Sequence, residues 1–269
     1  MDETSLRLLL SDLPIPVIRY YETIPSTNSA ALEWMQQVGV EGEIPDGSLL
    51  VANAQTAGRG RMNRQWVTEA DAGLAFTLVF HPSPFELERL SLFSGLAALA
   101  ISQVLEKSYK LSSAIKWPND VLSNGCKIAG ILVETSWLGD VIEGIVVGIG
   151  INITSESLPP PDILRFPATC VEDILGQKVD SLEVLHSVLR ALFLWRTRIG
   201  TLQFIQSWNE KLAFRGEWVN IEQAGQPPIT GVVQGVSEDG SLILRTENGV
   251  DVEVMVGDVC LRPKTDLIK

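Results

Sequence analysis

The sequence predicts an α/β (α+β) protein in which a mixed β-sheet with flanking helices is followed by a small β-barrel. Up to about residue 215, apolar runs of strand length alternate with stretches that favour helices. After Phe214-Arg215-Gly216, short strands are separated by Asp239-Gly240 and Asn248-Gly249, and short strands at such regular spacing are typical of a small barrel. We therefore expect one domain at residues 1–215 and a second at residues 216–269.

The individual elements follow from apolar runs and from turn signals. Asn124-Gly125 is a strong two-residue hairpin signal and Leu138-Gly139-Asp140 is a second, so a meander is expected around them. Expected strands of the first part lie at residues 18–22, 48–53, 73–80, 114–117, 127–136 and 141–149. Expected helices lie at residues 29–37, 88–106, 170–175, 182–199 and 201–212. Expected strands of the second part lie at residues 218–222, 229–236, 242–245 and 250–256.

The composition indicates a cytoplasmic enzyme. A formal net charge of −12 argues against a general nucleic-acid binder, because phosphate contacts need clustered positive charge. The three cysteines are widely spaced and odd in number, and with two histidines they predict neither a disulfide framework nor a zinc site. Leu8-Leu9-Leu10 is too short for a signal peptide. The densest apolar stretch, residues 90–105, is interrupted by polar residues and predicts a buried helix, not a membrane span.

Two clusters of basic residues stand out on this acidic background. Gly58-Arg59-Gly60-Arg61-Met62-Asn63-Arg64-Gln65-Trp66 combines glycines, which let a backbone approach a ligand closely, with arginines, which suit carboxylates and phosphates. Such a segment alone also fits a solvated basic turn. A second cluster, Lys116-Trp117-Pro118-Asn119-Asp120 followed by Lys127-Ile128-Ala129-Gly130, favours a shared site for small anions.

Taken together, these motifs resemble those of the biotin–protein ligase family. In the family's order they are Ser26-Thr27-Asn28, Gly-Arg-Gly-Arg-x-x-Arg-x-Trp, Lys-Trp-Pro-Asn-Asp, Lys-Ile-Ala-Gly-Ile-Leu-Val-Glu and Gly148-Ile149-Gly150-Ile151-Asn152. The resemblance covers residues from about 20 to about 262. One departure is Asn63, where members of the family usually carry glycine. If the backbone is left-handed there, asparagine is the next best residue after glycine, and a β-branched residue would be unfavourable.

The resemblance implies a class II synthetase-like catalytic domain followed by an SH3-like barrel. The implied enzyme is a biotin–[acetyl-CoA-carboxylase] ligase that uses ATP and Mg²⁺ to form biotinyl-5′-AMP. It then passes biotin to a lysine of the biotin carboxyl carrier protein of acetyl-CoA carboxylase. Many members carry an N-terminal helix-turn-helix. Only about twenty residues precede the first expected strand here, so we expect a short form that binds neither nucleic acid nor membrane.

The resemblance also assigns roles to residues of the motifs. The catalytic residues are expected to be Lys127, Arg61 and Asp120. The expected biotin contacts are Ser26, Thr27, Asn28, Gln55, Arg59, Gly60, Arg61 and Lys127. The expected nucleotide contacts are Arg61, Arg64, Trp66, Lys116, Asn119, Asn152 and Arg262. Metal ligands are not assigned.

The chemistry of carboxylate activation suits these residue types independently of the family. When a carboxylate attacks the α-phosphorus of ATP, two anions approach each other, and fixed cations aimed at the developing charge relieve the repulsion. The arginines of the first cluster with Lys116 and Lys127 are suitable cations, and Mg²⁺ would serve the β,γ-phosphates. No protein nucleophile is needed, and a glycine-rich loop that orders on binding can exclude water.

Several alternatives stay open at this stage. Ser26-Thr27-Asn28 also fits a helix N-cap, Asp120 could cap a turn, and Trp66 could be a core aromatic. Cys126 has no histidine partner nearby in sequence and is interpreted as a spectator thiol. Two other functions remain, a lipoate or octanoate ligase-transferase and a non-catalytic biotin sensor. An exposed sheet edge could pair two subunits as a homodimer or remain bare.

Overall fold

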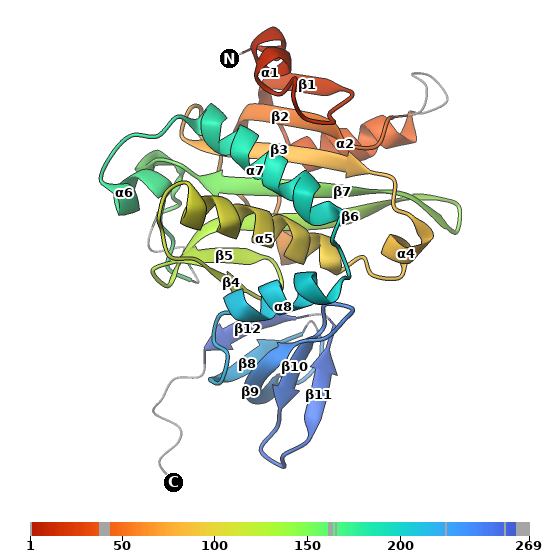
Figure 1. The fold of residues 1–269 in the computed structure, drawn as a ribbon, viewed down its shortest axis with the longest axis vertical. Coiled ribbons are helices and arrows are strands. Elements are labelled where there is room, and N and C mark those ends of the chain that lie inside the picture. Colours follow the sequence, from red (N-terminus) through yellow and green to blue (C-terminus); the bar gives the residue numbers. More distant parts are fainter. Residues whose placement is uncertain are drawn as a thin grey trace.

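The computed structural model describes residues 2–37, 44–160, 164, 166–223, 225–255 and 257–261, with Asn63, Cys260 and Leu261 described by their backbone alone. The larger part is built on a seven-stranded mixed sheet with the order β1-β2-β3-β7-β6-β5-β4 (Figure 1). Only β1 and β2 pair in parallel among these described strands. The strands are β1 Ile18–Ile24, β2 Ser48–Gln55, β3 Gly73–Phe80, β4 Ala114–Lys116, β5 Asp120–Ser123, β6 Cys126–Leu138 and β7 Val141–Asn152.

Helices cover the two faces of this sheet unequally. The helices α5 (Leu92–Lys107) and α7 (Ser181–Arg196) pack together over one face (Figure 1). The shorter α2 (Thr27–Gln36) covers only part of the opposite face, where it packs with Leu50, Val79 and Val146. Because neighbouring residues of a strand point to opposite faces, the odd-numbered residues of central β7, such as Val147, join the α5 core instead. The part of the α2 face beyond the helix N-terminus is covered by the Gly58–Trp66 loop instead of by this helix.

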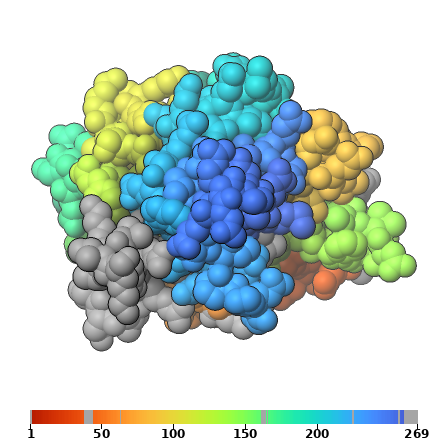
Figure 2. Space-filling view, turned by 90° about the horizontal axis from the view of Figure 1, so that it is seen from below, coloured from red at the N-terminus to blue at the C-terminus, as the bar shows by residue number. Residues whose placement is uncertain are grey.

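The C-terminal region is a five-stranded antiparallel sheet with the order β11-β10-β9-β8-β12, which follows α8 (Leu202–Lys211). Its strands are β8 Trp218–Glu222, β9 Ile229–Val236, β10 Leu242–Arg245, β11 Asp251–Val254 and β12 Asp258–Leu261. Within the residues described, β11 and β12 are the two edge strands and do not pair with each other. The expected SH3-like barrel is therefore, in this described part, a five-stranded sheet that is not closed by backbone hydrogen bonds. It occupies the centre of the lower face (Figure 2) and is attached through the Trp117 indole nitrogen, which donates to Gly240 O at 2.9 Å.

Many expected elements appear close to their expected bounds. The Asn124-Gly125 turn has φ of 49° and 76°, the left-handed pair that a two-residue hairpin requires. The expected helix at 29–37 instead begins at Thr27, because the Ser26 side chain caps it by accepting from Ser29 N. The expected helix at 88–106 begins at Leu92, because a separate helical turn, α4 (Pro84–Leu87), precedes it with its own Ser83–Glu86 capping box.

Some short elements were not expected from the sequence. They are α1 (Glu3–Leu9), the strands β5 and β12, and the 3-10 turns η1 (Arg61–Asn63) and η2 (Ser155–Ser157). The helix α6 (Val171–Leu175) was expected. In the described part of the chain, no helix has the length and apolar character needed to cross a bilayer.

Candidate active site

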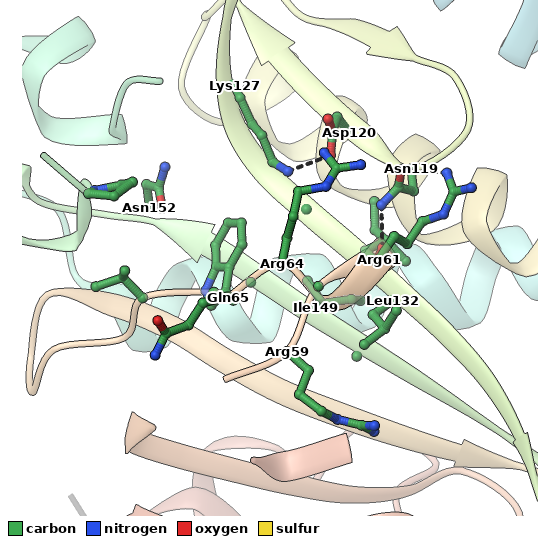
Figure 3. Close-up of a pocket in the computed structure, with 18 of the residues that line it drawn as sticks. Arg59, Arg61, Arg64, Gln65, Asn119, Asp120, Lys127, Leu132, Ile149 and Asn152 are labelled. Carbon is green, nitrogen blue, oxygen red and sulfur yellow. Dashed lines mark hydrogen bonds and ion pairs between the residues drawn. The ribbon is translucent and has the colours of Figure 1, made fainter. Parts of the chain in front are cut away.

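A cavity of about 330 Å³ lies on the part of the α2 face that the helix leaves uncovered, beneath residues 58–67 (Figure 3). Its lining brings together residues from the start of α2, the end of β2, the Gly58–Trp66 loop, the β4–β5 turn and the strands β6 and β7. Every site residue expected from the sequence lines it except Arg262, which lies outside the described residues. These lining residues are Ser26, Thr27, Asn28, Gln55, Arg59, Gly60, Arg61, Arg64, Trp66, Lys116, Asn119, Asp120, Lys127 and Asn152.

The floor of the cavity is made of glycines on adjacent strands. Gly130 of β6 and Gly150 of β7 are register partners, and the Trp66 indole lies directly over them. A Cβ at Gly150 would stand 2.2 Å from the Trp66 ring, and one at Gly148 would stand 2.1 Å from Asn28 Oδ1. Real Cβ atoms essentially never come so close, so these positions need glycine to leave room for Trp66 and Asn28.

A hydrogen-bonded network fixes the polar side chains at the start of α2. Gln55 Oε1 accepts from Thr27 N at 2.8 Å, and Gln55 Nε2 donates to Thr68 Oγ1 at 3.1 Å. Thr77, a buried residue of β3, places its hydroxyl 2.8 Å from Thr27 Oγ1 and 2.7 Å from Asn28 Oδ1. The Ser26 side chain caps the helix, and Ser26 also lines the cavity. The triplet thus combines a helix cap with a cavity-lining position, as the sequence allowed.

A buried ion cluster forms one wall. Asp120 Oδ1 lies 2.6 Å from Lys127 Nζ (Figure 3). Asp120 Oδ2 lies 3.6 Å from Lys116 Nζ. Burial of Asp120 would raise the pKa of its carboxyl, but the charges of Lys127 and Lys116 outweigh it and hold the pKa below its usual 3.8. Lys127 Nζ also lies 5.4 Å from the Trp66 ring centroid, within cation–π range. Asp120 is thus an ionised carboxylate between two ammonium groups at neutral pH.

The Gly58–Trp66 loop is a small hairpin of its own. Trp66 N donates to Gly58 O at 2.9 Å and Gly60 N donates to Arg64 O at 2.7 Å. The left-handed residue in its described backbone is Met62, with φ 54° and ψ 41°. The left-handed position that the sequence suggested for Asn63 therefore falls one residue earlier, and the side chain of Asn63 is outside the described residues.

Two arginines of this loop reach the C-terminal sheet. Arg61 Nη1 lies 3.3 Å from Asp258 Oδ1, and Arg64 Nη2 pairs with the other oxygen of the same carboxylate. Arg61 also donates to Asn119 Oδ1 at 3.2 Å and to Gly257 O at 3.3 Å. Burial first, and then the charge of Arg64, lower the pKa of Arg61, whereas Asp120 opposes them. The first residue of β12 is therefore tied to two arginines that line the cavity.

The third arginine of the loop is held elsewhere. Arg59 is directed away from the Lys127–Asp120 pair (Figure 3), and its Nη2 lies 2.6 Å from Glu134 Oε2. Glu134 belongs to β6 and is register partner of Val146, so it stands on the α2 face. Among the described residues, the five cations that line the cavity are thus already paired with three carboxylates, Asp120, Glu134 and Asp258.

The two asparagines are tied to the backbone around the cavity. Asn119 Nδ2 donates to Ile131 O at 2.7 Å, which fixes the turn before β5 on the neighbouring strand β6. Asn152 Nδ2 donates to Thr169 O at 3.0 Å. Both amide nitrogens therefore tie the cavity lining to the neighbouring backbone. The amide oxygens differ: among the described contacts, Asn119 Oδ1 accepts from Arg61, whereas no such bond from Arg61 reaches Asn152.

Sequence reasoning assigned no role to four residues of this constellation, Thr77, Glu134, Phe166 and Asp258. Glu134 ends a motif used for the resemblance, and its charge in a buried strand was an available signal. Phe166 lies 5.3 Å from Lys116 Nζ by its ring centroid. No local pattern singles out Thr77 or Asp258. Within the residues described, no group of three or more His, Cys, Asp or Glu side chains could hold a metal ion.

Comparison with known proteins indicates the family to which the chain belongs. Residues 20–152 match the biotin/lipoate A/B protein ligase family, and residues 215–262 match the biotin protein ligase C terminal domain. A biotin–[acetyl-CoA-carboxylase] ligase of Paracoccus denitrificans is 35% identical over 84% of this chain and 93% of its own. A bifunctional ligase/repressor BirA of Bacillus spizizenii is 36% identical over 63% of this chain and 50% of its own, so the chain spans about half of that relative.

A solved structure shares the whole arrangement. The biotin protein ligase from Aquifex aeolicus in complex with biotin and ATP superposes with a TM-score of 0.77 and 30% identity, over 93% of this chain and 100% of that chain. The match covers both the mixed sheet with its flanking helices and the C-terminal sheet. From the two matched family regions and these relatives, we conclude that the chain belongs to the biotin–protein ligase family.

Proposed function

We propose that this chain is an ATP-dependent ligase that converts biotin to biotinyl-5′-AMP and transfers the biotinyl group to a lysine of a biotin carboxyl carrier protein. The proposal rests on the composition of the cavity. Its lining combines an apolar surface, made by Trp66 over the glycines of β6 and β7, with five described cationic side chains. Such a site suits a small acid with an uncharged ring and a carboxylate, together with a polyphosphate. The domains are proposed at residues 1–215 and 216–269.

In the first step, the polar network at Ser26, Thr27 and Gln55 would bind the ureido ring of biotin. The glycines of the floor let the Trp66 indole lie close to the sheet, and that indole would offer an apolar surface to the ring. The carboxylate would then point toward Lys127. One carboxylate oxygen attacks the α-phosphorus of ATP, the bond to the β-phosphate oxygen breaks, and pyrophosphate leaves. Lys127 and Arg61 would stabilise the negative charge that gathers between the two anions.

In the second step, the amine of the acceptor lysine attacks the carbonyl carbon of the mixed anhydride and AMP leaves. Asp120 would accept a hydrogen bond from that amine. Because its pKa is held below 3.8, Asp120 would act as an ionised acceptor that orients the neutral amine and stabilises the positive charge that develops on its nitrogen as the C–N bond forms, after which the nitrogen loses a proton to solvent or phosphate. Arg64, Lys116, Asn119, Asn152 and, beyond the described residues, Arg262 are proposed nucleotide contacts.

Mg²⁺ enters this proposal as the companion of the nucleotide. It usually keeps several waters and binds through substrate phosphates and one or two carboxylates, so a dedicated cage of protein ligands is not required. The described site fits that mode, because its carboxylates are already paired with cations. When bound, Mg²⁺ would neutralise charge on the β,γ-phosphates.

The acceptor is proposed from the name of the Paracoccus relative, a biotin–[acetyl-CoA-carboxylase] ligase. A single comparison tests the function: pyrophosphate release with biotin, with lipoate and with no acid, followed by transfer to a purified carrier domain. Biotin-dependent release with labelling of one carrier lysine is expected. Release with lipoate alone would support a lipoate ligase, and biotin binding without pyrophosphate would support a sensor.

A further inference from the structure

One carboxylate oxygen joins two segments that both line the cavity. Glu134 Oε2 accepts from Arg59 Nη2 at 2.6 Å and from Asn28 Nδ2 at 2.9 Å. Arg59 belongs to the Gly58–Trp66 loop, and Asn28 to the first turn of α2. Glu134 itself stands on β6, so the two contacts connect a loop, a helix and the sheet at one point.

The contacts of Asn28 show why its orientation depends on this carboxylate. Its Oδ1 accepts from Thr77, and its Nδ2 donates one hydrogen to Leu132 O at 3.1 Å and the other to Glu134. Both amide hydrogens are therefore used within the protein. Asn28 is also confined from below, because only the missing Cβ of Gly148 leaves it room. With these bonds made, the Asn28 amide holds the start of α2 on the sheet, and its two N–H groups are not available to a ligand.

The contacts of Arg59 lead to the same point. Its head group is directed away from the Lys127–Asp120 pair and is held by Glu134. The other two arginines of the loop are held by Asp258 on the C-terminal sheet. The loop is thus anchored at two points, by Glu134 of β6 through Arg59 and by Asp258 of β12 through Arg61 and Arg64.

From these contacts we infer that Glu134 is a positioning residue, which holds the Gly58–Trp66 loop closed against the start of α2. The inference deepens the proposed function and rests on it, since the molecule retained under the loop would be biotinyl-5′-AMP. Glu134 touches neither reacting group. Its effect should therefore appear in how long the intermediate stays bound, and only weakly in the rate at which the intermediate forms.

Adenylate retention gives the first test. Glu134→Ala should release biotinyl-5′-AMP about tenfold faster, because two charge-assisted hydrogen bonds are lost from a partly exposed site. The single-turnover rate of adenylate formation at saturating biotin and ATP should change less than about twofold. Glu134→Gln keeps an acceptor oxygen without the charge and should fall between the two. Glu143→Ala, a glutamate of the same hairpin whose carboxylate meets Ser136, is the matched control and should behave as the unaltered chain.

The pairing itself is tested by combining Glu134→Ala with Arg59→Ala. Either substitution removes the same contact, so the double variant should release the adenylate no faster than the faster single variant. Effects that multiply would show that the two residues act separately and would overturn the inference. Unchanged retention in Glu134→Ala would overturn it as well.

Limited trypsin digestion tests the loop without using the activity. Trypsin cuts after arginine, so cleavage after Arg61 and Arg64 reports how often the loop opens in the ligand-free protein. When each protein is digested at the same interval below its own melting temperature, Glu134→Ala should be cut several times faster than the unaltered chain, and Glu143→Ala should not. Equal cutting in all three would refute the anchoring role. If the unaltered chain releases no pyrophosphate with biotin, the proposed function fails while this arm still decides the role of Glu134.

Discussion

Replacing Gly148 by alanine should destabilise the protein by about 2–4 kcal/mol. The added Cβ would meet Asn28 Oδ1 at 2.1 Å and Cγ at 2.7 Å, where an ordinary contact needs at least 3.4 Å. The whole amide must therefore move. Its bonds to Thr77, Leu132 and Glu134 measure 2.7, 3.1 and 2.9 Å, and each such bond contributes about 1 kcal/mol. Overpacking in a closely packed site adds a cost of similar size.

Denaturant unfolding of Gly148→Ala measures this loss, and calorimetric titration with biotin measures its effect on the site. Gly60→Ala is the control, because Gly60 has φ −127° and a Cβ there would meet nothing nearer than 3.4 Å. Its stability should stay within about 0.5 kcal/mol of the unaltered chain. In the double variant Asn28→Ala/Gly148→Ala the clash is absent, so the two costs should not add. An unchanged unfolding midpoint for Gly148→Ala would refute the confinement of Asn28.

The remaining predictions concern charge, acid stability, the loop backbone and partners. Lys127→Gln should slow single-turnover adenylate formation about 1000-fold. The reason is that a unit charge about 4 Å from the developing anion contributes about 4 kcal/mol at an effective dielectric of about 20. A near-normal rate would show that Lys127 takes no part in the chemistry. Since the folded pKa of Asp120 lies below 3.8, its stabilising contribution is present above that pH and is lost as the pH falls through the folded value. In Lys127→Gln the pKa of Asp120 should rise, and acid unfolding followed by circular dichroism should begin at a higher pH than in the unaltered chain. Met62→Asn should preserve adenylate retention and Met62→Val should impair it, because a β-branched residue disfavours φ 54°; equal retention would show that this backbone position is unimportant. With a net charge of −12, the chain should give no sequence-dependent gel shift with DNA at micromolar protein, and such a shift would contradict the assignment.

Much of the fold could be predicted because its signals are local. The strand at residues 73–80 is a continuous apolar run and matches β3, since both faces of that central strand are buried. Asn124-Gly125 encodes its own turn through two left-handed residues. By contrast, β5 has four residues and follows directly on a turn, so no periodicity could identify it. The helix α5 was placed correctly, but its start was not, because the boundary depends on the capping box of a preceding turn.

The candidate site was predictable as a set of residue types and not as a set of contacts. Glycine at 148 and 150 is present in the sequence, but only the fold shows that it makes room for Asn28 and Trp66. Asp258 lies almost two hundred residues after Arg61, and no local pattern connects them. Ion pairs between distant segments arise from tertiary packing, which composition and spacing do not encode.

The ion pairs of the cavity explain how five cations can stand close together before an anionic substrate binds. Five cations around one cavity would repel each other if they stood alone. Asp120, Glu134 and Asp258 offset that repulsion in the ligand-free protein, and among the described residues of this cluster the cations outnumber the carboxylates by five to three. The three carboxylates differ in how easily a bound phosphate could replace them. Asp120 is buried and cannot leave its lysines without a large cost, whereas Asp258 holds arginines that a phosphate could bind equally well. A polyphosphate would therefore compete with Asp258 and not with Asp120, so binding can reorganise the C-terminal side of the loop while the lysine wall stays fixed.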